Sequence, residues 1–180
     1  MHVVSIVGMA GAGKSEVARV FTENGYSRVR FGDVTDEEVA RSGLELNEAN
    51  ERYVRELLRQ ERGMDIYARL NLPRIDSSLK HSHVVIDGLY SWEEYLFLKD
   101  YYKDDFYTVA VYSSPKTRYA RLSQRVDRHL SVEEAIGRDR AEIENTNKGG
   151  PLAVADFTIT NEASLENLRR EAKRVISEIA

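Results

Sequence analysis

The sequence predicts an α/β fold in which helices cover both faces of a mainly parallel sheet. Short segments rich in β-branched residues alternate with longer segments of helical periodicity along the chain, which is the pattern of successive strand–helix–strand units. The 180 residues include only three prolines, and no linker divides them. A chain of this length buries a substantial core as one unit. We therefore expect a single domain over residues 1–180.

The expected elements follow from the local periodicity of the chain. Strands are expected at residues 3–7, 28–31, 83–86, 107–112 and 157–160. Helices are expected at residues 15–24, 36–41, 47–61, 65–77, 92–102, 118–124 and 132–145, with a final helix within residues 165–179. In the helix at 47–61, Tyr53 aligns with Val54, Leu57 and Leu58 on one face, which predicts that Tyr53 lies in the core.

The composition argues against several classes of function. A formal net charge of −4 argues against a nucleic-acid partner, because proteins that bind nucleic acids usually carry a basic surplus. The chain has no cysteine, and its four histidines show no ligand spacing, so we expect no disulfide and no transition-metal site. The apolar run at residues 3–7 is too short to span a membrane and lacks the basic start of a signal peptide. We therefore expect no membrane partner and a cytoplasmic location.

Residues 8–15 read GMAGAGKS and fit the phosphate-loop pattern G-x-x-x-x-G-K-[ST] between an expected strand and an expected helix. The glycines let backbone N–H groups turn inward around an anion, and the following helix adds its positive end. Lys14 would reach the β- and γ-phosphates, and the Ser15 hydroxyl would bind Mg²⁺. A turn that only packs a helix on a strand does not require Lys and Ser at these positions. We predict ATP and Mg²⁺ as cofactors, although no base-specific motif separates ATP from GTP. The residues predicted to contact the nucleotide here are Gly8, Met9, Ala10, Gly11, Ala12, Gly13, Lys14, Ser15 and Glu16.

An arginine-rich segment follows the fourth expected strand. Arg118, Arg121, Arg125 and Arg128 are spaced three, four and three residues apart, so they share one face if the helix continues that far. Arginines on a closing segment would offset the charge that develops during phosphoryl transfer, and closure would exclude water. The alternative is a solvated basic face that pairs with nearby acids. Arg121, Arg125 and Arg128 are the candidates for a catalytic role.

Two carboxylates stand at the ends of expected strands, where open parallel sheets bind their ligands. Asp87 ends the segment HVVID, and Asp33 follows the segment RVRFG. If the phosphoryl acceptor is a hydroxyl group, Asp33 would accept its proton. If the acceptor is a nucleoside monophosphate, whose phosphate is already ionised, Asp33 would orient it. Capping of a turn is the alternative for both residues.

The segments GMAGAGKS, FGDV, VVIDGLYSWEEYLFLK and ADFTITNEASLENL, with the arginine-rich segment, resemble the small phosphate-loop kinases. The chain is most similar to archaeal-type proteins described as dephospho-CoA kinase-like or adenylate and cytidylate kinase-related. The resemblance runs over nearly the whole chain. It implies a three-layer P-loop NTPase fold with a five-stranded parallel sheet in the order 2-3-1-4-5. It also implies a core of residues 1–34, 80–114 and 151–180, a helical acceptor-binding insert at about 35–79, and a mobile lid at about 115–150.

The same resemblance assigns roles to several residues. Asp87 matches the acidic residue that assists Mg²⁺, usually through water, and Arg138 matches the arginine of an Arg-Asp pair in the lid. Arg62 and Arg69 lie where these kinases bind the acceptor phosphate, and Tyr53 would stack on a base if it were exposed. Asn161 lies where related kinases contact the adenine. A turn asparagine without a ligand is the alternative for Asn161.

The chain departs from the family pattern at two places. Tyr90 stands shortly after the Asp-Gly pair, where adenylate kinases carry an arginine that holds the acceptor phosphate. Two interpretations are open: Tyr90 hydrogen-bonds a different acceptor, or the chain has lost transfer activity. The segment NKGGPLAVAD also differs, and Lys148 with its two following glycines forms either a second phosphate-contacting loop or a plain connecting loop. We expect the connecting loop.

Together these features predict an ATP- and Mg-dependent kinase that acts on a small nucleotide-like acceptor, of the nucleoside monophosphate or dephospho-CoA type. The alternative is a non-catalytic ATP-binding switch that acts through a partner. Eight aromatic residues between positions 90 and 107 would supply its partner surface, because aromatic side chains are enriched at interfaces. Packing of one helix on the sheet explains the same residues, so the sequence leaves open whether the protein is a monomer or a homodimer.

Overall fold

One parallel sheet organises the molecule. In the computed structural model, which describes residues 1–126 and 129–179, five parallel strands are arranged in the order β2-β3-β1-β4-β5. The strands are β1 (Val3–Val7), β2 (Ser27–Arg30), β3 (Val84–Asp87), β4 (Phe106–Tyr112) and β5 (Phe157–Thr160). Ile6 of β1 lies opposite Asp87 of β3, and Val7 lies opposite Ala110 of β4. The predicted fold class and strand order are therefore confirmed.

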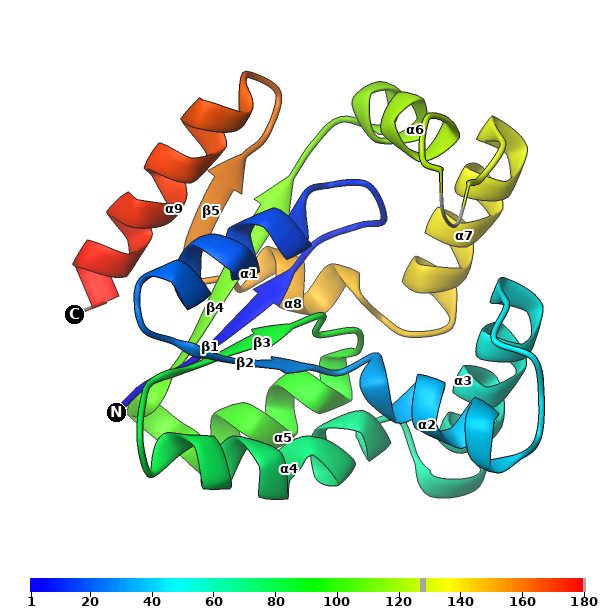
Figure 1. Cartoon of the computed structure of the whole chain (residues 1–180), viewed down its shortest axis with the longest axis horizontal. Helices are drawn as coiled ribbons and strands as arrows, with labels where there is room; N and C mark the ends of the chain where they lie inside the picture. The colour runs from blue at the N-terminus through cyan, green and yellow to red at the C-terminus, as the bar shows by residue number, and fades with distance from the viewer. Residues whose placement is uncertain (127–128, 180) are drawn as a thin grey trace.

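Alternating side chains of the central strand build two cores, one on each face of the sheet. Val3 and Val7 join the cluster that faces α4 (Ile66–Leu79) and α5 (Trp92–Tyr102). Val4 and Ile6 join the cluster that faces α1 (Lys14–Glu23) and α9 (Leu165–Ile179). Figure 1 shows these two helix pairs on opposite faces of the sheet. Every side chain of β1 is buried, whichever face of the sheet it points to. Helices must therefore cover both faces, which gives three layers.

Two helical segments extend beyond the carboxyl ends of the strands (Figure 1). After β2 come α2 (Asp33–Arg41) and α3 (Glu48–Arg62), and after β4 come α6 (Pro115–Ser123) and α7 (Val132–Glu144). A short α8 (Gly149–Ala153) precedes β5, and one 3-10 turn, η1 (Lys103–Asp105), precedes β4. The phosphate-loop sequence between β1 and α1 opens toward the same end of the sheet. The division into a core, an insert and a lid stays a prediction.

The helix that begins at Pro115 is shorter than the arginine spacing requires. It ends at Ser123, so Arg125 lies beyond it, and Arg128 lies outside the described residues. The Leu122 carbonyl accepts a hydrogen bond from the backbone N–H of Leu130, which the chain brings back to the buried Leu122 side chain. The condition for a shared face, a helix that continues through these arginines, is therefore not met.

Two further expectations are corrected. Tyr53 is 57% exposed, because the buried stripe of α3 runs along Val54 and Leu58 of the expected face and leaves Tyr53 at its edge. The segment around Lys148 is not a plain loop, since Gly149–Ala153 forms α8. Pro151 is compatible with this helix because it lies in the first turn, where its missing N–H has no helical partner.

The aromatic-rich helix α5 packs mainly on the sheet. Tyr95, Phe97 and Tyr102 lie against the core that α4 and α5 share, and the ring of Trp92 stacks on Tyr95 with centroids 5.0 Å apart. Tyr101 is about half exposed, and its hydroxyl donates to Asp76 of α4. Packing accounts for most of this cluster, while self-association stays a prediction. Among the described residues, none of the helices has both the length and the apolar character needed to cross a bilayer.

Candidate functional site

The loop from Gly8 to Gly13 has a conformation that only small residues permit. Gly11 and Gly13 have φ angles of 80° and 102°, and the Ala12 N–H donates to the Met9 carbonyl at 3.2 Å. A Cβ atom added to Gly13 would lie 2.4 Å from the Asn161 side-chain nitrogen, and one added to Gly8 would lie 2.5 Å from the Val111 carbonyl oxygen. The glycines of the motif are therefore required by left-handed backbone and by close packing.

Gly8→Ala should destabilise the fold by about 1–3 kcal/mol, because the new methyl group overpacks against the backbone of β4. The matched control is Gly137→Ala in the middle of α7, where an added Cβ meets nothing within 4 Å. This control should gain about 0.5–1 kcal/mol, since alanine is the better helix former. Urea unfolding of both variants checks the prediction, and a similar response of the two would contradict it.

Long-range hydrogen bonds from side chains hold the loop in place, and a further bond fixes one of the donors. The Asn161 side-chain amide donates to the Ala12 carbonyl at 2.8 Å, and Arg118 donates to the Ala10 carbonyl at 3.1 Å. Arg121 donates to the backbone carbonyl of Asn161 at 3.0 Å. Asn161 thus has a structural role that the sequence did not indicate, and its contact with adenine stays a prediction.

Lys14 lies inside this loop. Its ammonium group donates to the carbonyls of Gly8 and Met9 at 2.8 and 3.1 Å. Burial, and secondarily the nearby charge of Lys148, lowers the pKa of Lys14 to about 7, against the opposing effects of Glu142 and Asp87. The charged form of Lys14 is therefore destabilised by its surroundings, and a bound anion would stabilise it.

The two residues after Lys14 differ in their surroundings. Ser15 is exposed at the start of α1, so its hydroxyl is accessible. Glu16 accepts hydrogen bonds from Arg19 and Arg169, at 2.5 and 2.8 Å. The bond from Arg19 is the main reason that the pKa of Glu16 falls to about 2. A role for Glu16 in nucleotide binding stays a prediction, since its carboxylate already has two cationic partners.

The two predicted carboxylates lie at the carboxyl edge of the sheet. Asp87 ends β3, is buried, and accepts a hydrogen bond from Arg28 of β2. Asp33 begins α2, where Arg30 donates to it at 2.9 Å, and its side chain remains 45% exposed. The Asp87 carboxylate also raises the pKa of Lys14, so these two groups belong to one electrostatic cluster. Neither proposed role is tested by this arrangement.

Tyr90 lies against the turn that follows Asp87. Gly88 has a φ angle of 104°, and a Cβ atom there would lie 3.0 Å from the Tyr90 hydroxyl. The buried Glu94 fixes this turn by accepting hydrogen bonds from the backbone N–H groups of Tyr90 and Ser91, at 2.8 and 3.2 Å. Burial, and secondarily the charge of Asp87, raises the pKa of Tyr90 to about 12. The phenol is therefore protonated at neutral pH and can donate a hydrogen bond.

The structure adds an ion pair that the motifs do not contain. Lys148 is 1% exposed, and its ammonium group donates to Glu142 at 2.8 Å. Arg138 donates to the other oxygen of the same carboxylate at 3.3 Å. The Lys148 ammonium also lies 4.9 Å from the centre of the Tyr90 ring. The sequence leaves open whether Lys148 contacts phosphate, whereas no spacing or motif points to Glu142.

The Glu142 carboxylate gives the fold a measurable dependence on pH. Burial alone would raise its pKa, but the charges of Lys148, Lys14 and Arg138 lower it to about 2 from 4.5. The stability it contributes is therefore present above about pH 4.5 and is lost as the pH falls toward 2. Denaturant unfolding between pH 5 and 3 should show a shallower loss for Glu142→Gln than for the wild type. Identical slopes would contradict the assignment.

The predicted lid arginines have different surroundings. Arg138 pairs with Glu142, and it also lies 3.7 Å from the carboxylate of Glu48 on α3. It therefore links α7 to α3 beside the charged groups that surround Lys14. Arg121 is directed to Asn161 and to the Ser113 hydroxyl. Arg125 is exposed beyond the end of α6. The structure thus brings Arg138 to the cluster, whereas a catalytic role for Arg121 or Arg125 would require movement of this segment.

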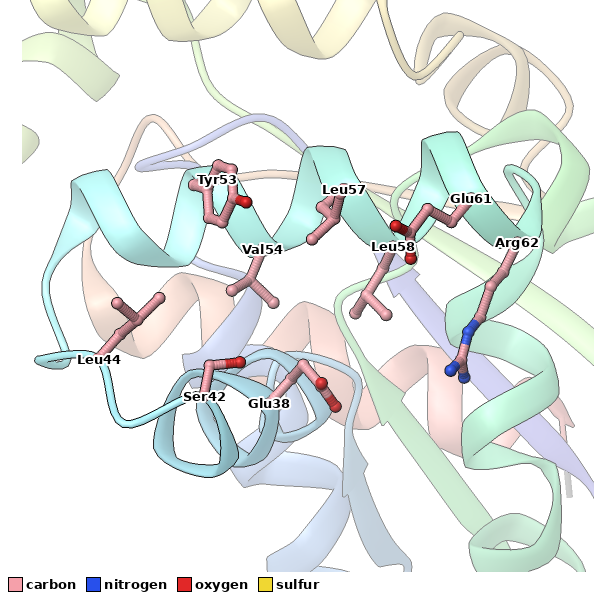
Figure 2. Close-up of a pocket in the computed structure, with 9 residues that line it drawn as sticks. All are labelled: Glu38, Ser42, Leu44, Tyr53, Val54, Leu57, Leu58, Glu61 and Arg62. Atoms are coloured by element: carbon pink, nitrogen blue, oxygen red, sulfur yellow. The ribbon is translucent and has the colours of Figure 1, made fainter.

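A pocket of about 300 Å³ lies between α2 and α3 (Figure 2). Its lining residues are Glu38, Ser42, Leu44, Tyr53, Val54, Leu57, Leu58, Glu61 and Arg62. Of the two arginines predicted to bind an acceptor phosphate, Arg62 lines this pocket. Arg69 pairs with Asp65 at 2.7 Å and lies over the Phe97 ring, so the two arginines do not share this pocket.

Comparison with known proteins places the chain in a family. The model of a family described as an AAA domain matches residues 4–145. A UPF0200 protein from Thermococcus sibiricus is 35% identical over 177 residues, which cover 96% of this chain and 93% of that protein. These two matches show the family to which the chain belongs.

Solved structures show the same fold. The shikimate kinase from Acinetobacter baumannii, in complex with shikimate, has a TM-score of 0.62 at 17% identity, over 99% of this chain and 93% of that one. The dephospho-CoA kinase from Campylobacter jejuni has a TM-score of 0.57 at 16% identity, over 99% and 97%. At such identities the likeness concerns the fold alone. The chain therefore belongs to the UPF0200 family, contains an AAA domain, and has the fold of the P-loop kinases.

Proposed function

We propose that the protein is an ATP- and Mg-dependent kinase that transfers the γ-phosphoryl group to a small nucleotide-like acceptor. The observation that carries this proposal is the position of Lys14. It lies in a glycine-shaped loop at the carboxyl edge of the sheet, in one electrostatic cluster with Lys148, Arg138 and Asp87. A charge-dense, largely dehydrated site of this kind stabilises a phosphoryl group during transfer.

The donor would be held by the loop backbone, by the N-terminus of α1 and by Lys14. The exposed Ser15 hydroxyl and the Asp87 carboxylate would supply oxygen ligands of the kind that Mg²⁺ prefers. Among the described residues, no group of three or more His, Cys, Asp and Glu side chains is placed to hold a metal. The remaining positions would be filled by phosphate oxygens and water, as is usual for Mg²⁺. When bound, Mg²⁺ would neutralise charge on the β- and γ-phosphates.

In the transfer step an acceptor oxygen forms a bond to the γ-phosphorus. The bond from that phosphorus to the β–γ bridging oxygen breaks, and ADP leaves. If the acceptor is a hydroxyl, as in a dephospho-CoA type of substrate, its proton passes to Asp33, which lies partly exposed at the start of α2. If the acceptor is a nucleoside monophosphate, the attacking phosphate oxygen carries no proton and Asp33 orients the acceptor.

The acceptor would enter between the α2–α3 segment and the turn at Tyr90. Arg62 offers a cation in the pocket between α2 and α3, and the exposed Tyr53 offers a ring on which a base would stack. Tyr90 offers a neutral hydrogen-bond donor where adenylate kinases carry an arginine, so this position supplies no positive charge to a second ionised phosphate. This feature favours the dephospho-CoA type of acceptor over the nucleoside monophosphate type.

The test is a panel of acceptors incubated with the protein and Mg-ATP. The panel contains dephospho-CoA, ribo- and deoxyribonucleoside monophosphates, and nucleosides, and mass spectrometry follows ADP and phosphorylated product. Product from one acceptor, absent with Lys14→Ala, would support the proposal. ADP released at the same rate with and without every acceptor would identify a simple ATPase instead. ATP binding without any turnover would favour the non-catalytic switch.

A further inference from the structure

Lys148 is a buried cation of the charge cluster around Lys14, but the proposed mechanism assigns it no contact with a substrate. It is 1% exposed, and its direct contacts are the Glu142 carboxylate at 2.8 Å and the face of the Tyr90 ring at 4.9 Å. A lysine is rarely buried so completely unless a partner requires it there. One carboxylate satisfies its charge, although the ammonium group has three hydrogens to donate.

The surroundings of Glu142 are those of an anion-binding site. Lys148 and Arg138 donate to its two oxygens. Lys14 lies near enough that its charge lowers the pKa of the Glu142 carboxyl. Three cations from the phosphate loop, from α7 and from the start of α8 therefore converge on one carboxylate. Because the loop binds phosphate in the proposed function, this carboxylate stands beside the position of the terminal phosphate.

The backbone at Lys148 is anchored beside α5. Two residues later, a Cβ atom on Gly150 would lie 2.6 Å from the Trp92 ring, so the start of α8 packs directly on α5. The Lys148 N–H donates to the Glu142 carbonyl at 3.3 Å. The backbone that carries the ammonium group is thus fixed, and release of Lys148 would require the Glu142 side chain to change rotamer.

We propose that Lys148 is a second phosphate-binding lysine, which Glu142 neutralises in the free protein and which binds the γ-phosphate of ATP when that phosphate displaces the carboxylate. The inference rests on the proposed function, because it takes ATP as the phosphoryl donor. It adds a residue and a resident counter-ion to the donor site. It also explains why a lysine is buried beside Lys14, where their like charges destabilise each other.

The experiment measures the affinity for Mg-ATP and for Mg-ADP by titration calorimetry in five proteins. They are the wild type, Lys148→Met, Glu142→Gln, the double variant and Lys14→Met. Methionine keeps the length and packing of Lys148 without its charge. Lys148→Met should weaken ATP binding about tenfold or more, as expected for a lost charge-assisted hydrogen bond. The affinity for ADP, which lacks the γ-phosphate, should fall much less.

The carboxylate variant gives an independent test. Glu142→Gln removes the competing charge, so it should bind ATP about tenfold more tightly than the wild type. The double variant should bind as weakly as Lys148→Met. If Lys148 only neutralises Glu142, the double variant would return to wild-type affinity, and that result would overturn the inference. Should Lys148→Met fail to fold, an unchanged ATP affinity in Glu142→Gln would overturn it instead.

Failure of the inference and failure of the proposed function are distinguishable. If the wild type binds ATP, Lys14→Met does not, and Lys148→Met matches the wild type, then only the inference fails. If Lys148→Met changes the Michaelis constant of the acceptor and leaves ATP binding intact, its phosphate partner belongs to the acceptor and the assignment is wrong. If the wild type does not bind Mg-ATP at all, both proposals fail.

Discussion

Replacing Lys14 with methionine should lower the rate of phosphoryl transfer by a factor on the order of 10³, the effect of removing one preorganised group that stabilises developing charge. The ammonium group is positioned by the carbonyls of Gly8 and Met9 and lies in a largely dehydrated site. Methionine fills the same volume, so the loop should keep its shape. Transfer is measured with the acceptor identified in the panel, and circular dichroism confirms that the variant is folded. Wild-type transfer by this variant would contradict the assignment.

The same substitution should change how stability depends on pH. Burial lowers the pKa of Lys14 to about 7 in the folded protein, below its ordinary value of 10.5. Between these two values the unfolded chain binds more protons, so the free energy of unfolding of the wild type should rise with pH. Lys14→Met lacks this group, and its stability should rise less over the same interval. If the free energy of unfolding has the same pH dependence in the wild type and in Lys14→Met, the pKa of Lys14 is not lowered in the folded protein.

Arg118→Met should destabilise the fold by about 3–5 kcal/mol, the usual cost of removing one partner from a buried ion pair. Arg118 is 4% exposed and donates two hydrogen bonds to Asp139, at 2.8 and 2.6 Å. It also donates to the carbonyls of Ala10 and Ser113. Without it, the Asp139 charge is left with Tyr119 as its hydrogen-bond donor. For a chain of this size we expect the melting temperature to fall by roughly 10 °C.

Two comparisons isolate the cause of this effect. Arg174→Met removes an exposed arginine that pairs with Glu171 and Glu178 on α9. It should cost less than about 1 kcal/mol. Arg118→Met combined with Asp139→Leu should recover much of the lost stability, because no buried charge is then left unpaired. If the single variant at Arg118 melts like the Arg174 variant, the buried pair contributes little.

The parts of the site that could be predicted are those encoded by neighbouring residues. The glycine spacing, Lys14 and Ser15 define the phosphate loop within eight residues, and the structure forms it between a strand and a helix as expected. Asp87 was placed at a strand end because β-branched residues precede it. The strand order followed from the resemblance rather than from the residues themselves.

The parts that could not be predicted depend on contacts between distant side chains. Arg118 looked like a lid residue, but Asp139 lies 21 positions away and draws it into the interior. The end of α6 at Ser123 lies beside the expected end at residue 124, but the hydrogen bond from Leu130 back to the Leu122 carbonyl was not predicted. The Glu142–Lys148 pair becomes visible only when α7 and α8 are placed beside the phosphate loop. Tyr53 was misassigned because periodicity fixes the buried face of a helix only to within one residue position.

The hydrogen bond from Asn161 to Ala12 has a consequence for how the protein acquires its binding site. The two residues are separated by 149 positions, which is most of the chain. Contacts of such long range form late in folding, because the intervening chain must first be ordered. During synthesis, residues 8–13 emerge early but lack their partner until β5 has left the ribosome. Nucleotide is therefore expected to bind only the completed molecule, and a chain that stops before Phe157 should fold partially without acquiring affinity for ATP.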